Sequence, residues 1–449
     1  MKKLFGTDGI RAVAGHHPLD YQSVFALGKA LPALLRGRGL EPDVLIGRDT
    51  RESGVWIERA LVQGIRAGRG RALSAGIITT SAISFLTLKH KYSAGVVISA
   101  SHNPYQDNGI KIFSSEGIKI ADDWEAELEK GIQAQTKALA ESLVPIRTRR
   151  SLVNEYVEFL TGQIDHLPLS PFSRPFKAVL DCSNGAGSDI APRVLAAVGC
   201  TVAVIHNKPD GRNINHACGS LHPHDLSLHV IKERADIGIA YDGDADRALW
   251  VDEQGRILNG DHTLYVQSLF MRARGRLCGN TIVATTMSNM GLEVALQHEG
   301  IRLHRTRVGD KYVLEQMIAL KSNLGGEQSG HTIFLDNCPT GDGILTSLKM
   351  IEAMAGSAAP LSELVRGFKE FPQILTNVRV SRKADFAEFP EITETMAEVK
   401  RKLGESGRLD VRYSGTEPLA RVMIEGQDRA EIEGLARRMA DVIAKYLGP

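Results

Sequence analysis

The chain has few cysteines, almost no net charge and no long hydrophobic run. Only five of its 449 residues are cysteine, and none of them forms a Cys-x-x-Cys pair. This argues against a disulfide framework or a zinc cluster, and it fits a reducing compartment. No apolar run approaches the roughly 18 residues that cross a bilayer, and no apolar signal core follows the N-terminus. We therefore expect a cytoplasmic globular protein without a membrane partner.

Charge and length narrow the class further. Lys and Arg total 54 against 53 for Asp and Glu, which gives a net charge of +1. Without a basic excess, the chain is not expected to bind nucleic acid. Hydrophobic residues make up 43% of the sequence and charged residues 24%, which is ordinary for a protein that forms a core. A chain of 449 residues is too long for one undivided core, so we expect several domains.

Alternating apolar runs and amphipathic stretches indicate α/β units. A β-branched run at Val44 is followed by a helical pattern, and this rhythm restarts near Val179 and Ile282. Continuous runs of this kind predict mostly parallel sheets covered on both faces by helices. From Phe371 onward, three strand-like segments and two helices predict a smaller α+β domain. We therefore expect an α/β protein with three related mixed α/β domains and a smaller C-terminal domain, at residues 1–155, 156–255, 256–370 and 371–449.

A polar loop directly follows the predicted strand at 95–98. It reads Ser-Ala-Ser-His-Asn-Pro over residues 99–104, and open α/β sheets place their ligands at such strand ends. The simpler alternative is a turn, because Ser, Asn and Pro are all turn formers. A serine hydroxyl needs activation by a base or a cation, and His102 and Lys111 lie close in the sequence. The loop alone leaves both interpretations open.

Three carboxylates alternate in a second loop, at Asp242, Asp244 and Asp246. Carboxylates held about 4 Å apart repel by about 4 kcal/mol at an effective dielectric of about 20. On an ordered turn they suggest a hard divalent cation with oxygen ligands, and a solvated acidic turn is the alternative. An EF-hand is disfavoured, because Arg247 stands where that loop needs glycine and both flanks have the pattern of strands.

Two further loops carry groups suited to a phosphorylated sugar. Residues 325–331 read Gly-Gly-Glu-Gln-Ser-Gly-His, in which Glu327 and Ser329 could bind sugar hydroxyls. A connecting turn explains these glycines equally well. Residues 412–418, followed by Arg421, combine two guanidiniums, two hydroxyls and a glycine into a possible phosphate cradle. A hairpin turn with exposed arginines is the alternative there.

Taken together, these four motifs in this order resemble the α-D-phosphohexomutase superfamily. The opening stretch Phe-Gly-Thr-Asp-Gly-Ile-Arg at residues 5–11 is a fifth match. Residues 288–293 and 308–313, together with Gln328, look most like the bacterial phosphoglucosamine mutases of that superfamily. The resemblance spans essentially the whole chain.

The resemblance implies four domains around a central cleft and a role for each motif. Ser101 would be the phosphoserine that donates and recovers a phosphoryl group. One Mg2+ per chain would be bound by Asp242, Asp244 and Asp246, with the Ser101 phosphate as a further ligand. The candidates for charge stabilisation or proton transfer are Arg11, His102, Lys111 and His331. The candidates for substrate binding are Arg247, Glu327 and Ser329 at the sugar, and Arg412, Ser414, Gly415, Thr416 and Arg421 at the phosphate that does not react.

The implied activity is the interconversion of glucosamine 6-phosphate and glucosamine 1-phosphate. It would proceed through glucosamine 1,6-bisphosphate and would feed UDP-N-acetylglucosamine and cell-wall synthesis. The nearest alternative is a phosphoglucomutase or phosphomannomutase, and more distant ones are a non-catalytic sugar-phosphate regulator and a phosphatase. The expected partner is a phosphorylated hexosamine, and the expected state is a monomer or homodimer.

Two positions depart from the family's pattern. Ala12 stands where the opening motif usually has Gly, which puts the geometry of that turn in doubt. Tyr413 stands where relatives often have Lys, which removes one cation from the phosphate loop.

Overall fold

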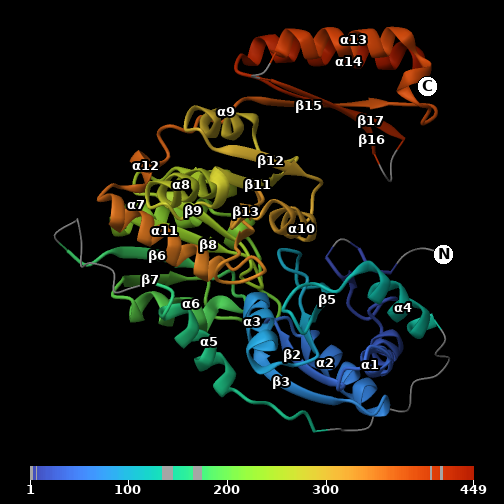
Figure 1. Ribbon diagram of the computed structural model, residues 1–449, viewed down its shortest axis with the longest axis vertical. Coiled ribbons are helices and arrows are strands. Elements are labelled where there is room, and N and C mark those ends of the chain that lie inside the picture. Colours follow the sequence, from blue (N-terminus) through green and yellow to red (C-terminus); the bar gives the residue numbers. More distant parts are fainter. Residues whose placement is uncertain (1–3, 7, 134–144, 165–173, 405–406, 415–417) are drawn as a thin grey trace. The chain divides into compact units, whose positions relative to one another are not determined.

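The structure is a computed structural model that describes the chain except for residues 1–3, 7, 134–144, 165–173, 405–406 and 415–417 (Figure 1). It divides into two compact units. Unit 1 comprises Met1–Met287 and His304–Val365, and unit 2 comprises Ser288–Leu303 and Arg366–Pro449.

The first sheet of unit 1 has the strand order β1-β5-β4-β2-β3. Its strands are β1 (Ile10–Val13), β2 (Asp43–Arg48), β3 (Arg71–Ile77), β4 (Ala94–Ile98) and β5 (Asp107–Ser114). The accompanying helices are α1 (Tyr21–Gly37), α2 (Gly54–Ala67), α3 (Thr80–His90) and α4 (Asp122–Gln133). Helix α1 begins after Asp20, whose carboxylate accepts the Ser23 N–H. Its buried leucines, Leu27, Leu31 and Leu35 among them, belong to the hydrophobic core. Helix α1 packs beside α2 (Figure 1).

The same rhythm recurs in two further sheets. The second sheet has the order β10-β9-β8-β6-β7, and the third has the order β12-β11-β13-β14. The strands of the second are β6 (Lys177–Asp181), β7 (Thr201–Ile205), β8 (Ile237–Tyr241), β9 (Ala248–Asp252) and β10 (Ile257–Leu258), and its helices are α5 (Ser151–Thr161), α6 (Gly187–Ala197) and α7 (His224–Glu233). The third sheet has β11 (Thr281–Thr285), β12 (Arg302–Thr306), β13 (Leu324–Gly326) and β14 (Thr332–Phe334). The helices of this region within unit 1 are α8 (Gly260–Ala273), α10 (Asp310–Leu320), α11 (Gly343–Ser357) and α12 (Leu361–Leu364).

The prediction of mostly parallel sheets was wrong. In the first sheet β2 pairs in parallel with β3 and β4, but β5 is antiparallel to both β4 and β1. In the second sheet β6 is parallel to β7 and β8, whereas β9 is antiparallel to β8 and β10. The physical reason is connection length. A parallel crossover needs a dozen or more residues, and only residues 99–106 join β4 to β5.

These antiparallel connections carry the motifs singled out in the sequence. The serine loop lies in 99–106 between β4 and β5, and the three aspartates lie in 242–247 between β8 and β9. The sugar motif lies in 327–331 between β13 and β14. The phosphate motif lies in 414–418 between β16 (Arg408–Tyr413) and β17 (Leu419–Glu425). Each of the four sheets therefore presents its polar groups on a hairpin connection.

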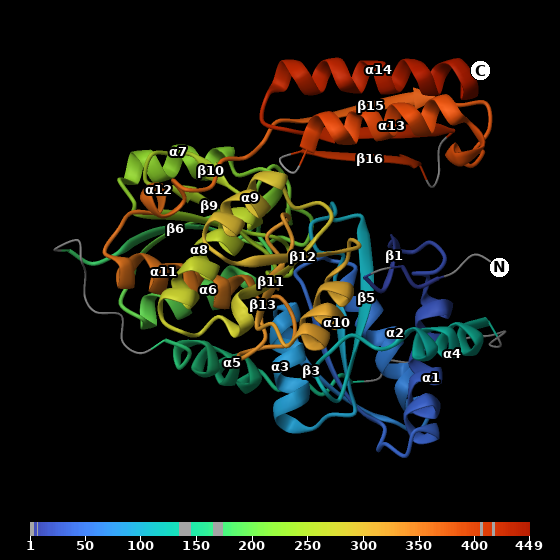
Figure 2. The same ribbon diagram turned by 45° about the horizontal axis from the view of Figure 1, so that its top comes forward.

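Unit 2 contains the predicted smaller α+β fold. Its antiparallel sheet has the order β15-β17-β16, with β15 at Gln373–Arg379. Helices α13 (Pro390–Leu403) and α14 (Arg429–Leu447) lie together on one face of this sheet (Figures 1 and 2). Asp428 begins α14 by accepting the N–H groups of Ala430 and Glu431, the usual role of an acidic side chain at a helix start. Helix α9 (Met290–His298) also belongs to this unit.

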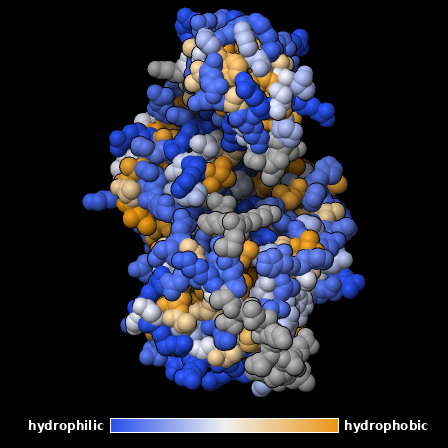
Figure 3. All heavy atoms as spheres, turned by 90° about the vertical axis from the view of Figure 1, so that its right-hand side faces the viewer, coloured by the Kyte–Doolittle hydropathy of each residue, from blue (hydrophilic) through white to orange (hydrophobic). Residues whose placement is uncertain are grey.

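The surface is mainly hydrophilic on the face drawn in Figure 3, where hydrophobic residues occur in small groups. Among the described helices, none combines the length and the apolar composition that crossing a bilayer requires.

A buried histidine at the start of α8 gives a pH prediction. The His262 imidazole completes a capping box with Asn259, and burial, followed by the charge of Arg256, lowers the pKa of His262 to about 4 from its usual 6.5. Between these two values the unfolded chain binds a proton that the folded chain does not. Stability is therefore lost as the pH falls from about 6.5 towards 4, by about 2 kcal/mol at pH 5.

Chemical unfolding at pH 7 and pH 5 tests this expectation. His262→Gln keeps an acceptor for the capping box but removes the titration, so its stability should fall less between the two pH values. The exposed His216 supplies the control, His216→Gln, which should behave as the parent does. Equal acid sensitivity of His262→Gln and the parent would rule out this source of destabilisation.

Candidate active site

Ser101 and the aspartate loop meet inside unit 1. Ser101 follows β4, is fully buried and has a left-handed backbone conformation with a φ of 53°. Its hydroxyl donates a hydrogen bond to Asp242 Oδ2 at 2.5 Å. The backbone of Gly243 lies against the Ser101 carbonyl so closely that a Cβ there would approach the carbonyl oxygen to 2.6 Å. The hydroxyl of the first sheet and the carboxylate of the second therefore share one site, as the sequence predicts.

The three aspartates form a candidate metal site. Their carboxylate oxygens lie within 4.8 Å of one another, and all three residues are buried. Asp244 Oδ1 and Asp246 Oδ1 are buried oxygens that accept no hydrogen bond from any described residue. Oxygen ligands with unused lone pairs suit a hard divalent cation. The residues present therefore fit the metal that the motif suggests.

The three aspartates differ in how far nearby cations offset their negative charge. Burial, followed by repulsion from Asp246 and Asp244, raises the pKa of Asp242 well above its usual range. Burial also raises the pKa of Asp246, but Lys111, His331 and Arg247 outweigh it and hold that pKa at about 2. A bound cation would relieve the repulsion among the three carboxylates.

Lys111 is a fully enclosed cation of the site. It lies on β5 with 1% of its surface exposed, and its Nζ donates to Asp244 Oδ2 at 2.9 Å and Asp246 Oδ2 at 3.2 Å. Burial lowers its pKa, but the neighbouring carboxylates of Asp244, Asp246 and Asp8 raise it well above the usual value. Lys111 is therefore a permanent positive charge beside the carboxylates, which makes it suited to charge stabilisation rather than to proton transfer.

Asp8 joins the opening motif to this site, a role that was not predicted. It pairs with Arg11 and Lys119, and it lies 3.3 Å from Lys111 Nζ. Burial raises the pKa of Asp8, but Lys111, Lys119 and Arg11 lower it well below its usual range. Arg11 is thereby fixed beside the serine and aspartate loops. The sequence signal was present in the opening motif, but the two lysine partners of Asp8 lie on other segments.

His102 and Arg247 contact each other at the rim of the aspartate loop. Arg247 Nη1 donates to His102 Nδ1 at 3.0 Å. His102 Nδ1 also lies 3.3 Å from Ser101 Oγ. Burial, then the charges of Arg247 and Arg11, lower the pKa of His102 to about 4. The imidazole is therefore neutral near pH 7.

The predicted sugar-binding side chains line one cavity. A cavity of about 530 Å3 is bordered by Arg247, Glu327 and Ser329, and further by Asn259, Thr285, Met287, Val308 and Gln328. Glu327 Oε1 accepts the Gly309 N–H at 3.1 Å, which fixes this carboxylate at the start of α10. A sugar-sized space with a cation, a carboxylate and a hydroxyl on its wall can bind a polyol.

His331 lies deeper, at the end of the same loop. It is 3% exposed, and neither ring nitrogen makes a hydrogen bond with a described residue. Its Nε2 lies 3.6 Å from Asp310 Oδ2, and its backbone forms an isolated bridge with Arg247. The structure therefore brings His331 to the same loops as Arg247 and Asp246.

Two residues that were not predicted from the sequence form hydrogen bonds to the serine loop. Arg51 is fully buried, and its guanidinium pairs with the carboxylate of Asp49 at 2.9 Å. The same group donates to three carbonyl oxygens of the loop, those of Ser101, Asn103 and Pro104, and to that of Asp107 at the start of β5. Asn215 Nδ2 adds hydrogen bonds to the oxygens of Ser101 at 2.9 Å and Asn103 at 3.0 Å. The Asp-Thr-Arg run at 49–51 follows a predicted strand end, and that was the available signal.

In unit 2, Arg412 on β16 and Arg421 on β17 are directly opposed in the sheet. Arg421 Nη2 lies 3.4 Å from Ser414 Oγ, and Lys383 Nζ donates to the Ser414 carbonyl at 2.6 Å. Three cationic side chains therefore belong to this end of the sheet. The predicted ligands Gly415 and Thr416 lie outside the described residues.

Tyr413 has a structural role in the same unit. Its hydroxyl donates to the Ala384 carbonyl at 2.7 Å, and its ring stacks on Phe386 with 4.5 Å between the centroids. Tyr413 is therefore a packing residue of this unit, while Lys383 brings a cation to Ser414.

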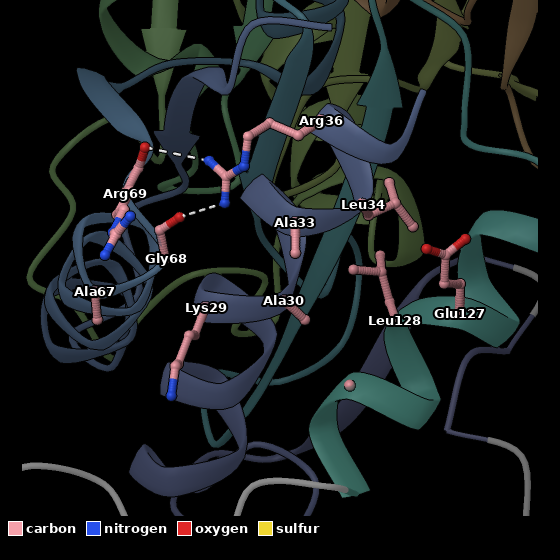
Figure 4. Close-up of a pocket in the computed structure, with 11 residues that line it drawn as sticks. Lys29, Ala30, Ala33, Leu34, Arg36, Ala67, Gly68, Arg69, Glu127 and Leu128 are labelled. Carbon is pink, nitrogen blue, oxygen red and sulfur yellow. Dashed lines mark hydrogen bonds between the residues drawn. The ribbon is translucent and has the colours of Figure 1, made fainter. Parts of the chain in front are cut away.

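A different cavity, of about 550 Å3, lies between α1, α2 and α4 and contains none of the predicted site residues (Figure 4). Its side chains include Ala30 and Leu34 of α1, facing Leu128 of α4. Arg36, which also lines it, donates to the carbonyls of Gly68 and Arg69 at the end of α2. This arginine therefore secures the packing of α1 against α2.

Comparison with known proteins identifies all four domains in order. The phosphoglucomutase/phosphomannomutase α/β/α domains I, II and III match residues 2–139, 154–255 and 259–371, and the C-terminal domain of that family matches residues 375–442. A phosphoglucosamine mutase of Koribacter versatilis is 47% identical, with 100% of this chain and 98% of that protein covered. One of Solibacter usitatus is 44% identical, with 100% and 99% covered.

Solved structures share the fold. A phosphoglucomutase/phosphomannomutase family protein of Burkholderia thailandensis superposes with a TM-score of 0.81 at 24% identity, covering 99% of this chain and 98% of that one. The N-acetylphosphoglucosamine mutase of Aspergillus fumigatus, solved with GlcNAc-6P and magnesium, gives a TM-score of 0.65 at 20% identity, covering 98% and 95%. With four matching domains and full-length relatives above 40% identity, the chain belongs to the phosphoglucomutase/phosphomannomutase family.

Proposed function

We propose that this protein interconverts glucosamine 6-phosphate and glucosamine 1-phosphate, with Ser101 as the phosphoryl carrier. The observation that carries the proposal is the hydrogen bond from Ser101 Oγ to Asp242 Oδ2 at 2.5 Å, which joins a nucleophile to a metal-type carboxylate cluster. Membership of the family makes the protein an isomerase that moves a phosphoryl group. The choice of glucosamine follows the activity of its full-length relatives.

The reaction requires two phosphoryl transfers of opposite direction. In the first, the bond from phosphorus to Ser101 Oγ breaks while the 1-hydroxyl of glucosamine 6-phosphate gains the phosphoryl group and loses its proton, and Ser101 Oγ takes up a proton to become a hydroxyl. Glucosamine 1,6-bisphosphate then turns round, and the Ser101 hydroxyl loses its proton as it takes the phosphoryl group from position 6, while the sugar O6 gains a proton. Glucosamine 1-phosphate and phosphoserine are the products. Such transfers depend on in-line positioning and charge neutralisation more than on covalent chemistry.

The residues of unit 1 supply both requirements. Asp242, Asp244 and Asp246 would hold Mg2+, which when bound would neutralise the oxygens of the transferring phosphoryl group. Lys111 and Arg247 add fixed positive charge beside the carboxylates. Glu327 and Ser329 would hold the sugar hydroxyls in the cavity that Arg247 borders. On unit 2, we assign Arg412, Ser414 and Arg421 to binding a phosphate, with Gly415 and Thr416 as further ligands.

We propose that each of the four predicted domains provides one part of the active site. Residues 1–155 provide the serine, 156–255 the metal ligands, 256–370 the sugar loop and 371–449 the phosphate loop.

Substrate choice is tested by turnover of glucosamine, glucose and mannose 6-phosphates in parallel, with a trace of the matching 1,6-bisphosphate. We expect kcat/KM to be at least about tenfold higher for the glucosamine compound, because a pocket built for one polar substituent rejects others by at least that factor. Inorganic phosphate release should stay far below turnover, which separates a mutase from a phosphatase. Preference for glucose or mannose phosphate would contradict the proposed substrate.

The metal assignment is tested with Asp244→Asn. The amide keeps an acceptor for Thr80 Oγ1, which lies 2.6 Å from Asp244 Oδ2, so the fold should be preserved. Loss of a charged ligand should raise the Mg2+ concentration for half-maximal activity by about tenfold or more. Asp189→Asn, at a side chain that is 75% exposed on α6, is the matched control and should leave the Mg2+ response unchanged. An unaltered response in Asp244→Asn would remove this residue from the metal site.

A further inference from the structure

A second group of metal-ligating side chains lies in unit 1, outside the aspartate loop. Among the described residues, only Asp181, His206 and Cys218 form another set of three whose ligand atoms all lie within 4.8 Å of one another. They provide a carboxylate oxygen, an imidazole nitrogen and a thiol sulfur. Nothing in the proposed mechanism uses them.

The second sheet brings the three together. Asp181 is the last residue of β6 and His206 follows β7, and these neighbouring parallel strands end side by side. Cys218 precedes the short 3-10 turn Gly219–Leu221. Asp181 is fully buried, with Oδ1 accepting the Ser183 N–H at 2.9 Å and Oδ2 accepting the Gly219 N–H at 2.8 Å. These backbone bonds fix the carboxylate and leave it lone pairs for a further partner.

The donor set is chemically specific. Carboxylate, imidazole and thiolate together suit Zn2+, whereas Mg2+ avoids sulfur. In a tetrahedral zinc site, with bonds of about 2.0–2.3 Å, ligand atoms lie about 3.3–3.8 Å apart. His206 Nδ1 lies 3.1 Å from Asp181 Oδ2, close to that spacing. The cluster therefore needs little rearrangement to receive an ion.

Two buried polar atoms at this cluster have no hydrogen-bond partner among the described residues, which supports a bound ion. His206 Nδ1 is buried and makes no hydrogen bond with any described residue, in spite of its short distance to Asp181. The hydroxyl of Ser183, two residues after Asp181, is also buried without a hydrogen-bond partner in the described chain. A simple ion pair between His206 and Asp181 would account for two of the residues. The thiol of Cys218, which is 1% exposed, accepts a hydrogen bond from Asn184 Nδ2 at 3.9 Å and would release its proton on binding the ion.

We propose that Asp181, His206 and Cys218 bind one Zn2+ per chain, at a site separate from the aspartate loop. The His206 side chain is 28% exposed, so solvent has access to complete the coordination. The ion is bound through one side chain from each of three segments, those ending β6, following β7 and preceding the 3-10 turn.

The consequence of binding is mechanical. The three ligands lie at the end of β6 and on the segment after β7, and the segments that follow these two strands already contact each other. Asn184 N donates to His206 O at 2.6 Å, and Asn215 N donates to Ser183 O at 2.9 Å. Asn215 in turn donates to the Ser101 carbonyl. Zinc would therefore stiffen the loop that holds the serine loop, without taking part in phosphoryl transfer.

Metal titration of the full-length, chelator-stripped protein tests the site. Co2+ serves as the spectroscopic probe, because coordination to a thiolate gives a near-ultraviolet charge-transfer band together with visible d–d bands. We expect one equivalent of Co2+ to produce both, one equivalent of Zn2+ to displace it, and Zn2+ to raise the unfolding temperature. Absence of the charge-transfer band, or no Zn2+-dependent rise in unfolding temperature, would overturn the proposal.

Variants assign the ligands. Cys218→Ser should abolish the charge-transfer band, and His206→Gln, at a partly exposed position, should weaken Zn2+ binding by about 10- to 100-fold. Cys278→Ser removes an exposed cysteine and should bind zinc as the parent does. Asp242→Asn should likewise retain the zinc site, which keeps this test separate from that of the proposed function. Retention of the band in Cys218→Ser, or equal zinc affinity in His206→Gln, would exclude the assigned ligands.

Discussion

Ser101→Ala is expected to reduce turnover of glucosamine 6-phosphate by at least about 1,000-fold, because the covalent phosphoryl carrier is lost. The substitution removes one buried hydroxyl whose bond goes to Asp242, so the fold should be retained. A coupled assay, run with and without added 1,6-bisphosphate, measures the effect. The bisphosphate should fail to restore activity, because no hydroxyl remains to accept its phosphoryl group.

The control for this variant is Ser115→Ala, at the half-buried serine that follows β5. It should keep parental kcat and KM. Full activity in Ser101→Ala would refute the role given to that hydroxyl, while equal losses in both variants would point to a general effect on folding.

Arg51→Met is expected to have the largest effect on stability. It leaves the Asp49 carboxylate buried without its cation and removes four hydrogen bonds to the serine loop and the start of β5. Breaking a buried ion pair from one side costs about 3–5 kcal/mol. Denaturant unfolding should show a loss of this size, and Arg59→Met, at an exposed arginine of α2, should show little change. A loss below about 1 kcal/mol in Arg51→Met would contradict this account of the loop.

The role of Arg51 in positioning the loop is separated from stability by two milder variants. Arg51→Lys keeps the charge but loses the planar fork, which donates to several carbonyls at once. Asn215→Ala removes the two hydrogen bonds from the other side of the serine loop. Both should fold, and both should lower kcat while leaving KM for the sugar phosphate unchanged, since neither residue contacts substrate. A rise in KM at constant kcat would indicate a role in binding instead.

Local patterns in the sequence predicted much of the fold. The helix starts at Asp20 and Asp428 depend only on side chains that accept backbone N–H groups within a few residues, which is a local pattern. The strand ending at Ile98 and the small α+β fold after Phe371 were likewise predicted from runs of apolar residues. Strand direction was not, because a continuous apolar run has the same appearance in parallel and antiparallel pairs. The length of the 99–106 connection held that information.

In the candidate site too, local motifs could be predicted and contacts between distant segments could not. Ser101 and the three aspartates could be predicted as candidates because each chemical group stands in one short motif, and their roles stay predictions. Arg51 and Asn215 were missed because their partners are backbone carbonyls of a loop that is distant in sequence, and no side-chain pattern marks such an acceptor. Asp8 was missed for a related reason, since its charge is balanced by lysines on other segments. Cytoplasmic location and the monomeric or dimeric state stay predictions.

The path of the phosphoryl group tests the central claim most directly. Enzyme is incubated with glucosamine 1,6-bisphosphate carrying 32P in both phosphates and is then freed of ligand. One portion is digested and mapped by peptide mass, and the other is chased intact with unlabelled glucosamine 6-phosphate. We expect label on the peptide containing Ser101, and its quantitative transfer during the chase, through the 1,6-bisphosphate, to glucosamine phosphates, with almost no inorganic phosphate. Label on another residue, or label released as inorganic phosphate, would contradict it.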